Sequence, residues 1–278
     1  MTRIGIMQGR LVPPRAGRFQ CFPRDEWQRE FPLASRAGLS CLEWIWDLDE
    51  TNPLSDDGGM FRVAALAAGH DVAVLSVCAD YFMERPLVKG SPAERHGRRD
   101  QLAWLIRRCQ RWRMERIVLP FVDASRLDSE EDLQRLSEIL GSLLPLCDES
   151  GVEIHLETDL APDPFAALLD QLPGPLIKVN YDSGNSASLG YRPREEFAAY
   201  GARVGSVHIK DRRLGGGTVP LGKGDADFPE LFDCLQKVHY RGDFILQAAR
   251  GEPGDEVRWA VANKSFVEAG IVGRGTVP

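Results

Sequence analysis

Eight short β-rich runs alternate with longer amphipathic stretches, and this alternation restricts the possible folds more than any other feature. The runs are "RIGIM" (3–7), "CLEWI" (41–45), "VAVLSVC" (72–78), "RIVLPF" (116–121), "VEIHLE" (152–157), "LIKVNYD" (176–182), "VGSVHIK" (204–210) and "DFILQ" (243–247). Consecutive runs end about 25 to 43 residues apart, which leaves room for crossover helices such as those expected at 93–113, 129–149 and 228–239. Eight such units predict an α/β fold, a (β/α)8 TIM barrel, rather than a doubly wound sheet.

The chain length agrees with one barrel. A chain of 278 residues is about right for a single (β/α)8 domain, and no linker or change of composition divides it. No GxGxxG motif follows the first run, which disfavours a dinucleotide-binding domain. We therefore expect one domain over 1–278, with the Gly- and Pro-rich residues 271–278 as a loose C-terminal tail.

Composition limits the kinds of binding partner and the cellular compartment that we expect for this chain. The 34 Lys and Arg residues against 41 Asp and Glu residues give a net charge of −7, and no basic run of five exists, so we expect no nucleic-acid partner. No apolar stretch reaches the roughly 18 residues that span a bilayer, and the N-terminus lacks the features of a secretory signal. Six scattered cysteines without a CxxC pair predict free thiols in a reducing, cytoplasmic compartment.

Three successive strands carry polar side chains on the face that should point into the barrel. Side chains alternate along a strand, so in these strands the apolar set faces the helices and the polar set faces the axis. Glu157, Asp182 and His208 end their strands at the face where barrel enzymes build their sites. Glu153 and Lys178 lie four residues earlier, and we expect them to form an ion pair deeper in the barrel.

Two carboxylates and an imidazole at one rim suit a divalent cation such as Mn²⁺, Mg²⁺, Co²⁺ or Zn²⁺. The segments "IGIMQGRL", "LEW", "HLETD", "NYDSGN", "VHIKD" and "LGKGDADF" follow one another along nearly the whole chain. In this order they resemble the xylose isomerase-like TIM-barrel superfamily of sugar and sugar-phosphate isomerases and epimerases, which also includes apurinic endonucleases and inositol-pathway dehydratases. The resemblance implies one divalent ion, preferably Mn²⁺, held by Glu157, Asp182 and His208. It also implies a carbohydrate substrate and allows a homo-oligomer.

The fourth ligand of that family is a glutamate, and Gln247 stands in its place. An amide oxygen can coordinate a cation, but it cannot carry a proton near neutral pH. In the family's epimerases the carboxylates at positions 157 and 247 act as an acid–base pair on opposite faces of the substrate. The substitution favours an isomerase that works through an enediolate with Glu157 as its base, or a dehydratase or lyase that needs one base. Four side chains could replace the missing base: Glu43, Asp80, His155 and Lys210.

Six residues are expected to contact substrate: Arg10, Glu43, His155, Asn185, Lys210 and Arg250. Glu43 ends the second strand and could bind hydroxyls or form a rim salt bridge. Lys210 and Arg10, with Arg212 and Arg213 beside the Gly-rich loop, could recognise a phosphate or could be solvated loop charges. His155 could reach substrate or be a satisfied core histidine. Asn185 could bind a hydroxyl or cap a turn, and Arg250 follows Gln247 closely.

Two further functions compete with the isomerase interpretation. A trinuclear-zinc endonuclease needs several additional histidines, but this chain has five, of which only His155 and His208 lie on inward strand positions. A binding or scaffold protein that has lost catalysis is supported only by Gln247. Bound metal distinguishes this last possibility from the enzymes.

Overall fold

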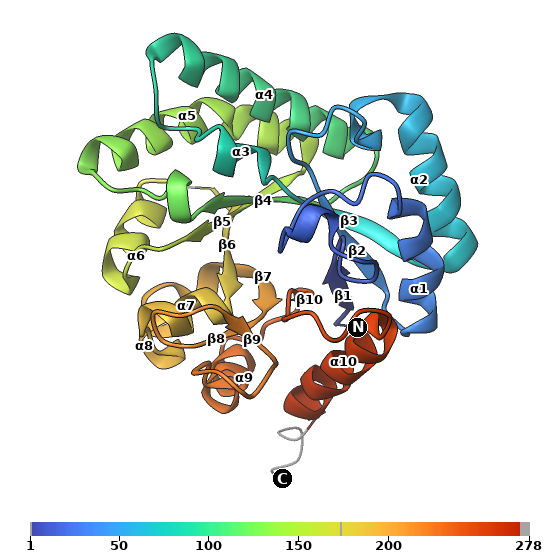
Figure 1. The fold of residues 1–278 in the computed structure, drawn as a ribbon. Helices are drawn as coiled ribbons and strands as arrows, with labels where there is room; N and C mark the ends of the chain where they lie inside the picture. The colour runs from blue at the N-terminus through green and yellow to red at the C-terminus, as the bar shows by residue number, and fades with distance from the viewer. Residues whose placement is uncertain (1, 173, 273–278) are drawn as a thin grey trace.

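The computed structural model describes residues 2–172 and 174–272, and in these residues eight parallel strands form a closed barrel. The barrel strands are β1 (Ile4–Met7), β2 (Cys41–Ile45), β3 (Ala73–Cys78), β4 (Arg116–Phe121), β5 (Glu153–Thr158), β6 (Ile177–Asp182), β7 (Val204–Ile209) and β10 (Phe244–Leu246). Their order is β1-β10-β7-β6-β5-β4-β3-β2, so neighbours in sequence are neighbours in space (Figure 1). Seven of these strands fall within their predicted runs, and β5 extends one residue beyond its run, to Thr158; the predicted (β/α)8 barrel is confirmed.

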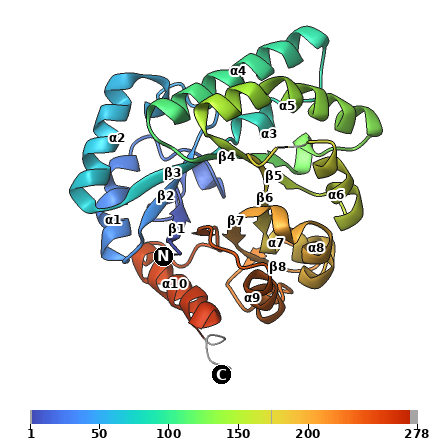
Figure 2. The same cartoon turned by 180° about the vertical axis from the view of Figure 1, so that it is seen from behind.

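A ring of helices covers the outside of the barrel (Figures 1 and 2). The helices are α1 (Glu30–Arg36), α2 (Asp57–His70), α3 (Tyr81–Glu84), α4 (Pro92–Arg111), α5 (Glu130–Ser150), α6 (Pro162–Asp170), α7 (Ser183–Leu189), α8 (Pro193–Tyr200), α9 (Phe228–Lys237) and α10 (Glu256–Val272). A short antiparallel pair, β8 (Asp211–Arg212) and β9 (Thr218–Val219), lies in the loop after β7. No helix in the described part of the chain is both long enough and apolar enough to cross a membrane.

Local sequence signals explain where the long helices begin and end. Ser91 and Glu94 form a reciprocal capping box at the start of α4, and Pro92 occupies its first turn. Helix α5 begins after Ser129, whose side chain accepts from the Asp132 amide, and it ends at Gly151 in the left-handed conformation.

The C-terminal end and the cysteines test two further expectations. Helix α10 continues through Val272, so the tail expected at 271–278 does not begin at 271, and its remaining residues, 273–278, lie outside the described residues. All six cysteines are free thiols, as the absence of a CxxC pair predicted.

A polar layer fills the barrel below its mouth. Lys178 Nζ lies 2.5 Å from Glu153 Oε1, so the predicted ion pair is confirmed. A series of hydrogen bonds connects this layer to the rim. His155 Nδ1 pairs with Ser206 Oγ at 2.7 Å, and Ser206 donates to Asn180 Oδ1 at 2.6 Å. Because each polar group has a partner, its burial is compensated, and the layer positions Asn180 under the site.

A buried glutamate that the sequence did not single out fixes the loop after β1. Glu30 is fully buried, and its Oε1 accepts from the backbone amides of Gly9 at 2.6 Å and Leu11 at 3.5 Å. Gly9 has a φ of +81°, a conformation that favours glycine. Arg250 closes the same loop by donating to the carbonyls of Gly9 at 2.5 Å and Val12 at 2.9 Å. The loop that follows β1 therefore has a fixed path across the barrel mouth.

The burial of Glu30 makes stability depend on pH. Burial raises the pKa of Glu30 from 4.5 to about 8, and the backbone donors reduce this shift. Between these two values the folded state keeps a proton that the unfolded state loses, so folding stability falls as pH rises through this window. We expect Glu30→Gln, which cannot ionise, to gain stability relative to the wild type by about 2 kcal/mol or more between pH 5 and pH 8.

Urea denaturation of both proteins at pH 5, 6, 7 and 8 measures this difference. The control is Glu153→Gln, because the ion-pair partners of Glu153 outweigh its burial and lower its pKa to about 2, outside the window. A difference between Glu30→Gln and wild type that stays constant from pH 5 to pH 8 would contradict the assignment.

Candidate functional site

Three adjacent strands bring two carboxylates and an imidazole to one point at the barrel mouth. Glu157 lies near the end of β5, Asp182 ends β6, and His208 lies near the end of β7, directly opposite Asp182 in the strand register. One candidate ligand atom from each side chain lies within 4.8 Å of the others. His208 Nδ1 is 3.2 Å from Glu157 Oε2 and 3.9 Å from Asp182 Oδ2. All three side chains are buried, so the structure brings together the trio that the sequence predicted.

The start of helix α7 orients Asp182. Its Oδ1 accepts from the backbone amides of Gly184 at 2.9 Å and Asn185 at 2.8 Å, which makes Asp182 the N-cap of the helix. Its Oδ2 faces the imidazole and also lies 3.3 Å from Lys210 Nζ. One oxygen therefore has a structural role, and the other remains available to a cation.

Two asparagine amides fix the carboxylate of Glu157. Asn185 Nδ2 donates to Oε1 at 2.6 Å, and Asn180 Nδ2 donates to Oε2 at 2.8 Å. Asn185 in turn accepts at its Oδ1 from Lys210 at 3.2 Å and Arg212 at 3.0 Å. The predicted site residues Asn185 and Lys210 thus lie in the site, where they hold the two carboxylates in place.

A buried carboxylate on the opposite side of the imidazole sets its orientation. His208 Nε2 lies 2.6 Å from Glu43 Oε1, and both side chains have no exposed surface. When Nε2 donates to Glu43, the lone pair of Nδ1 points toward Glu157 and Asp182. Nδ1 is buried and forms no hydrogen bond. An unpartnered nitrogen lone pair beside two carboxylates is unfavourable unless a proton or a cation lies among them.

The pKa of His208 reflects the negative charge of its surroundings. Burial alone would lower the pKa of His208, but the carboxylates of Glu43 and Glu157 outweigh burial and raise the pKa to about 10. A divalent cation that coordinates Nδ1 would replace the proton in the same environment. The residues present therefore fit a divalent cation.

Gln247, the fourth predicted ligand, also has an oxygen atom without a hydrogen-bond partner. Gln247 follows β10, and its backbone amide donates to the carbonyl of Ile209 at 3.0 Å. Its side-chain Nε2 donates to Gln20 Oε1 at 2.9 Å, whereas its buried Oε1 has no hydrogen-bond partner. The amide oxygen, which is the atom that can coordinate a cation, is thus the atom left without a partner.

Glu157 and Gln247 line a pocket of about 490 Å³ at the barrel mouth. Its wall includes polar groups from several βα-loops, which is where barrel enzymes bind their ligands. Besides these two, the lining residues with charged or amide side chains are Arg18, Gln20, Asp80, Glu84, Asp123, Asp159, Asn185, Lys210 and Arg212.

Four residues expected to contact substrate lie outside the wall of this pocket. Glu43 lies behind His208. His155 lies one layer deeper, where both of its ring nitrogens are occupied, by Glu153 at 2.8 Å and Ser206 at 2.7 Å. Arg250 binds the backbone of the β1 loop, as described above. Arg10 donates to the Phe19 carbonyl at 2.8 Å and packs 3.8 Å from the Phe19 ring. These four side chains support the site rather than line it.

Gln20 belongs to the site but was not expected from the sequence. It lies in the long loop between β1 and α1, and it reaches both Gln247 and Asp80, which are 227 and 60 residues away in sequence. The composition of this loop does not indicate these two contacts. They arise from the path of the loop, which Glu30, Arg10 and Arg250 fix.

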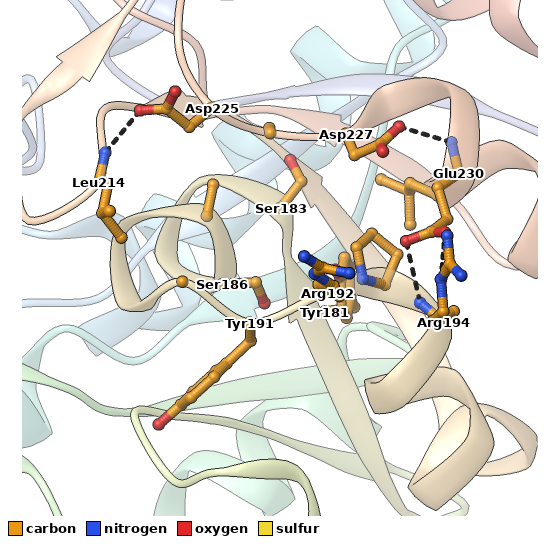
Figure 3. A pocket seen from close by; sticks show the side chains of 15 residues that line it. Tyr181, Ser183, Ser186, Tyr191, Arg192, Arg194, Leu214, Asp225, Asp227 and Glu230 are labelled. Atoms are coloured by element: carbon orange, nitrogen blue, oxygen red, sulfur yellow. Dashed lines mark hydrogen bonds and ion pairs between the residues drawn. The ribbon is translucent and has the colours of Figure 1, made fainter.

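A second pocket, of about 370 Å³, is lined by residues of α7, α8 and the first turn of α9 (Figure 3). Four of its five charged side chains bind one another or the backbone: Arg194 Nε donates to Glu230 at 2.6 Å, Asp225 accepts from the Leu214 amide at 2.7 Å, and Asp227 accepts from the Glu230 amide at 2.9 Å. The pocket contains none of the three converging ligands, so the mouth of the barrel is the candidate site.

Comparison with known proteins identifies related chains. A family model described as "Xylose isomerase-like TIM barrel" matches residues 31–264. A protein of Escherichia coli (strain K12) named "Putative L-ribulose-5-phosphate 3-epimerase SgbU" is 23% identical over 261 residues, covering 87% of this chain and 91% of the relative.

An inosose dehydratase of Clostridium perfringens is 26% identical over 175 residues, which is 54% of this chain and 58% of the dehydratase. The match thus spans little more than half of that relative's length. Among solved structures, the IOLI protein with a binding zinc atom superposes with a TM-score of 0.77 at 14% identity, covering 99% of this chain and 100% of the other. The TM-score of 0.77 shows that the two chains share a fold.

The contact between Glu43 and His208 leads to a test. We expect Glu43→Gln to weaken Mn²⁺ binding by about 10- to 100-fold, because partners behind a ligating histidine fix its tautomer and raise its basicity. Isothermal titration calorimetry with Mn²⁺ measures the change.

The matched control is Glu153→Gln, which removes a carboxylate that bonds His155 in the same way but does not touch the three ligands. Its Mn²⁺ affinity should stay near that of the wild type. Equal affinities for Glu43→Gln and Glu153→Gln would show that the carboxylate behind His208 has no role in metal binding.

Proposed function

The chain belongs to the xylose isomerase-like TIM-barrel family, and on this premise we propose that it is a divalent-metal-dependent isomerase of an unphosphorylated keto-sugar. The observation that carries the proposal is the convergence of Glu157, Asp182 and His208 within 4.8 Å at the barrel mouth. Two carboxylates and the Gln247 amide oxygen, with one imidazole, suit Mn²⁺, which favours carboxylate and carbonyl oxygens.

The metal and the protein divide the chemistry between them. When bound, a divalent cation supplies a Lewis acid that polarises a carbonyl group and offsets the negative charge of an enediolate. Glu157 lines the pocket and carries the proton between two adjacent carbons on one face of the substrate. Asn180 and Asn185 hold its carboxylate from below and from the side, so the base keeps one orientation during the transfer.

The amide at position 247 determines which reaction this site supports. Gln247 lines the same pocket as Glu157 but cannot take up or release a proton near neutral pH. Inversion of a carbon centre needs proton carriers on both faces, whereas transfer between neighbouring carbons on one face needs only Glu157. Isomerisation therefore fits the observed side chains better than epimerisation does.

The charges around the pocket favour a neutral substrate. Five carboxylates line it, at Asp80, Glu84, Asp123, Glu157 and Asp159, against three cations at Arg18, Lys210 and Arg212. All three cations have partners: Arg18 lies 3.7 Å from Glu84, Lys210 binds Asp182 and Asn185, and Arg212 binds Asn185 and the Gly216 carbonyl. Apart from the divalent cation itself, a phosphate dianion would meet more carboxylates than basic side chains in this wall, and each basic side chain already has a partner.

Dehydration of a cyclic polyol ketone is the second candidate, because an inosose dehydratase is among the relatives and this reaction also needs one base. The two reactions differ in their products. Proton NMR after incubation in D₂O separates the two reactions. The product of isomerisation has the same composition as the substrate apart from exchanged deuterium, whereas the product of dehydration has lost one molecule of water.

We expect Mn²⁺-loaded protein to convert one or more neutral keto-hexoses or keto-pentoses and to be at least tenfold less efficient, in kcat/KM, on their phosphate esters. A panel of matched pairs of free and phosphorylated sugars, analysed by NMR, measures this. A preference for the phosphorylated member of each pair would contradict the neutral-substrate proposal.

We expect Glu157→Gln to lower turnover by at least about 100-fold while its circular dichroism spectrum and melting temperature stay close to wild type, because it removes the proton carrier. Asp159→Asn, two residues along the same rim, is the control for removing a carboxylate from the pocket. Wild-type turnover in Glu157→Gln would exclude this residue as the base.

A further inference from the structure

Two amides and a carboxylate form a hydrogen-bonded chain along one side of the pocket. Gln247 Nε2 donates to Gln20 Oε1 at 2.9 Å, and Gln20 Nε2 donates to Asp80 Oδ2 at 2.9 Å and Oδ1 at 3.2 Å. Cys78 Sγ donates to the same carboxylate at 3.1 Å. All of these residues line the pocket together with Glu157.

The direction of each hydrogen bond in this chain follows from the group at its end. An ionised carboxylate can only accept, so Gln20 must turn its nitrogen toward Asp80 and its oxygen toward Gln247. That oxygen also only accepts, so Gln247 must turn its nitrogen toward Gln20. The carbonyl oxygen of Gln247 is then left unpartnered, as observed.

The chemistry of Asp80 is consistent with this role. Burial raises its pKa to about 6, and the hydrogen bonds from Gln20 and Cys78 limit the rise. Burial also raises the pKa of the Cys78 thiol, which therefore keeps its proton and acts as a donor. At pH 7.5 the carboxylate is the acceptor that the chain requires.

We propose that Asp80, acting through Gln20, is a positioning residue that aims the carbonyl oxygen of Gln247 at the cation held by Glu157, Asp182 and His208. This inference rests on the proposed function, because it assigns Gln247 as the fourth ligand of that site. It also explains why an acid at position 80 accompanies an amide at position 247.

The side chains preferred at positions 80 and 247 depend on each other. A glutamate at 247 would place a carboxylate oxygen against Gln20 Oε1, and Gln20 could turn its nitrogen toward 247 only by turning its oxygen toward the Asp80 carboxylate. An asparagine at 80 removes that conflict, since its amide can donate to the reversed Gln20. The preferred pairs are therefore acid with amide, or amide with acid.

A double-mutant cycle in Mn²⁺ affinity tests the proposal. The proteins are wild type, Asp80→Asn, Gln247→Glu and the double variant, titrated with MnCl₂ by calorimetry at pH 7.5. In the wild-type background we expect Asp80→Asn to weaken binding by about 10-fold or more, the usual scale for residues behind a ligand. In the Gln247→Glu background we expect the same change to strengthen binding.

The control for charge is Asp123→Asn, which removes one carboxylate from the same pocket but has no bond to Gln20. Its Mn²⁺ affinity should change by less than threefold in both backgrounds. An effect of Asp80→Asn equal to that of Asp123→Asn, or the same factor and sign in both backgrounds, would overturn the proposal.

The same experiment separates this inference from the proposed function. Failure of the wild type to bind Mn²⁺, or binding that His208→Ala leaves unchanged, would rule out the metal site itself. If the wild type binds Mn²⁺, His208→Ala abolishes binding and Asp80→Asn leaves the Mn²⁺ affinity unchanged, the metal site stands. Only the role of Asp80 is then overturned. Circular dichroism melts of every variant exclude unfolding as the cause of lost binding.

Discussion

The buried contact between Glu43 and His208 is the interaction on which the rest of the site depends. It fixes one nitrogen of the imidazole at 2.6 Å from a fully buried carboxylate and turns the other toward Glu157 and Asp182. Among the described residues, Glu43 is the one group that hydrogen-bonds the His208 ring. The closed barrel makes this contact possible. Strand β2, which bears Glu43, and strand β7, which bears His208, are not neighbours in the sheet, and their side chains meet in the barrel interior.

The sequence predicted the barrel and the convergence of three side chains because both follow from local patterns. Side-chain alternation places Glu157, Asp182 and His208 inward, and parallel strands in a barrel bring their carboxyl ends to one rim. Glu153 and Lys178 were predicted as a pair for the same reason, since they share the inward face one layer deeper. These predictions need only the strand periodicity and the order of the strands.

The roles of Arg10, Arg250 and Gln20 could not be predicted because they depend on the path of a loop. Residues 8–29 have no strand periodicity, and their course is set by Glu30, which lies outside the barrel strands. The sequence identified Glu43 and Arg10 as polar residues at strand ends, which was enough to select them but not to place them. Strand position fixes where a side chain starts, whereas long-range contacts decide which group it meets.

Charge balance gives a physical reason for the neutral residue at position 247. Three carboxylates, Glu43, Glu157 and Asp182, surround the imidazole, and Lys210 offsets one of them. The remaining two negative charges equal the charge of one divalent cation, so a carboxylate at 247 would leave the buried site with an excess negative charge. Uncompensated charge is costly in a buried site. In the function proposed above, the amide oxygen of Gln247 would complete the ligand set without that cost, and Glu157 alone would transfer the proton.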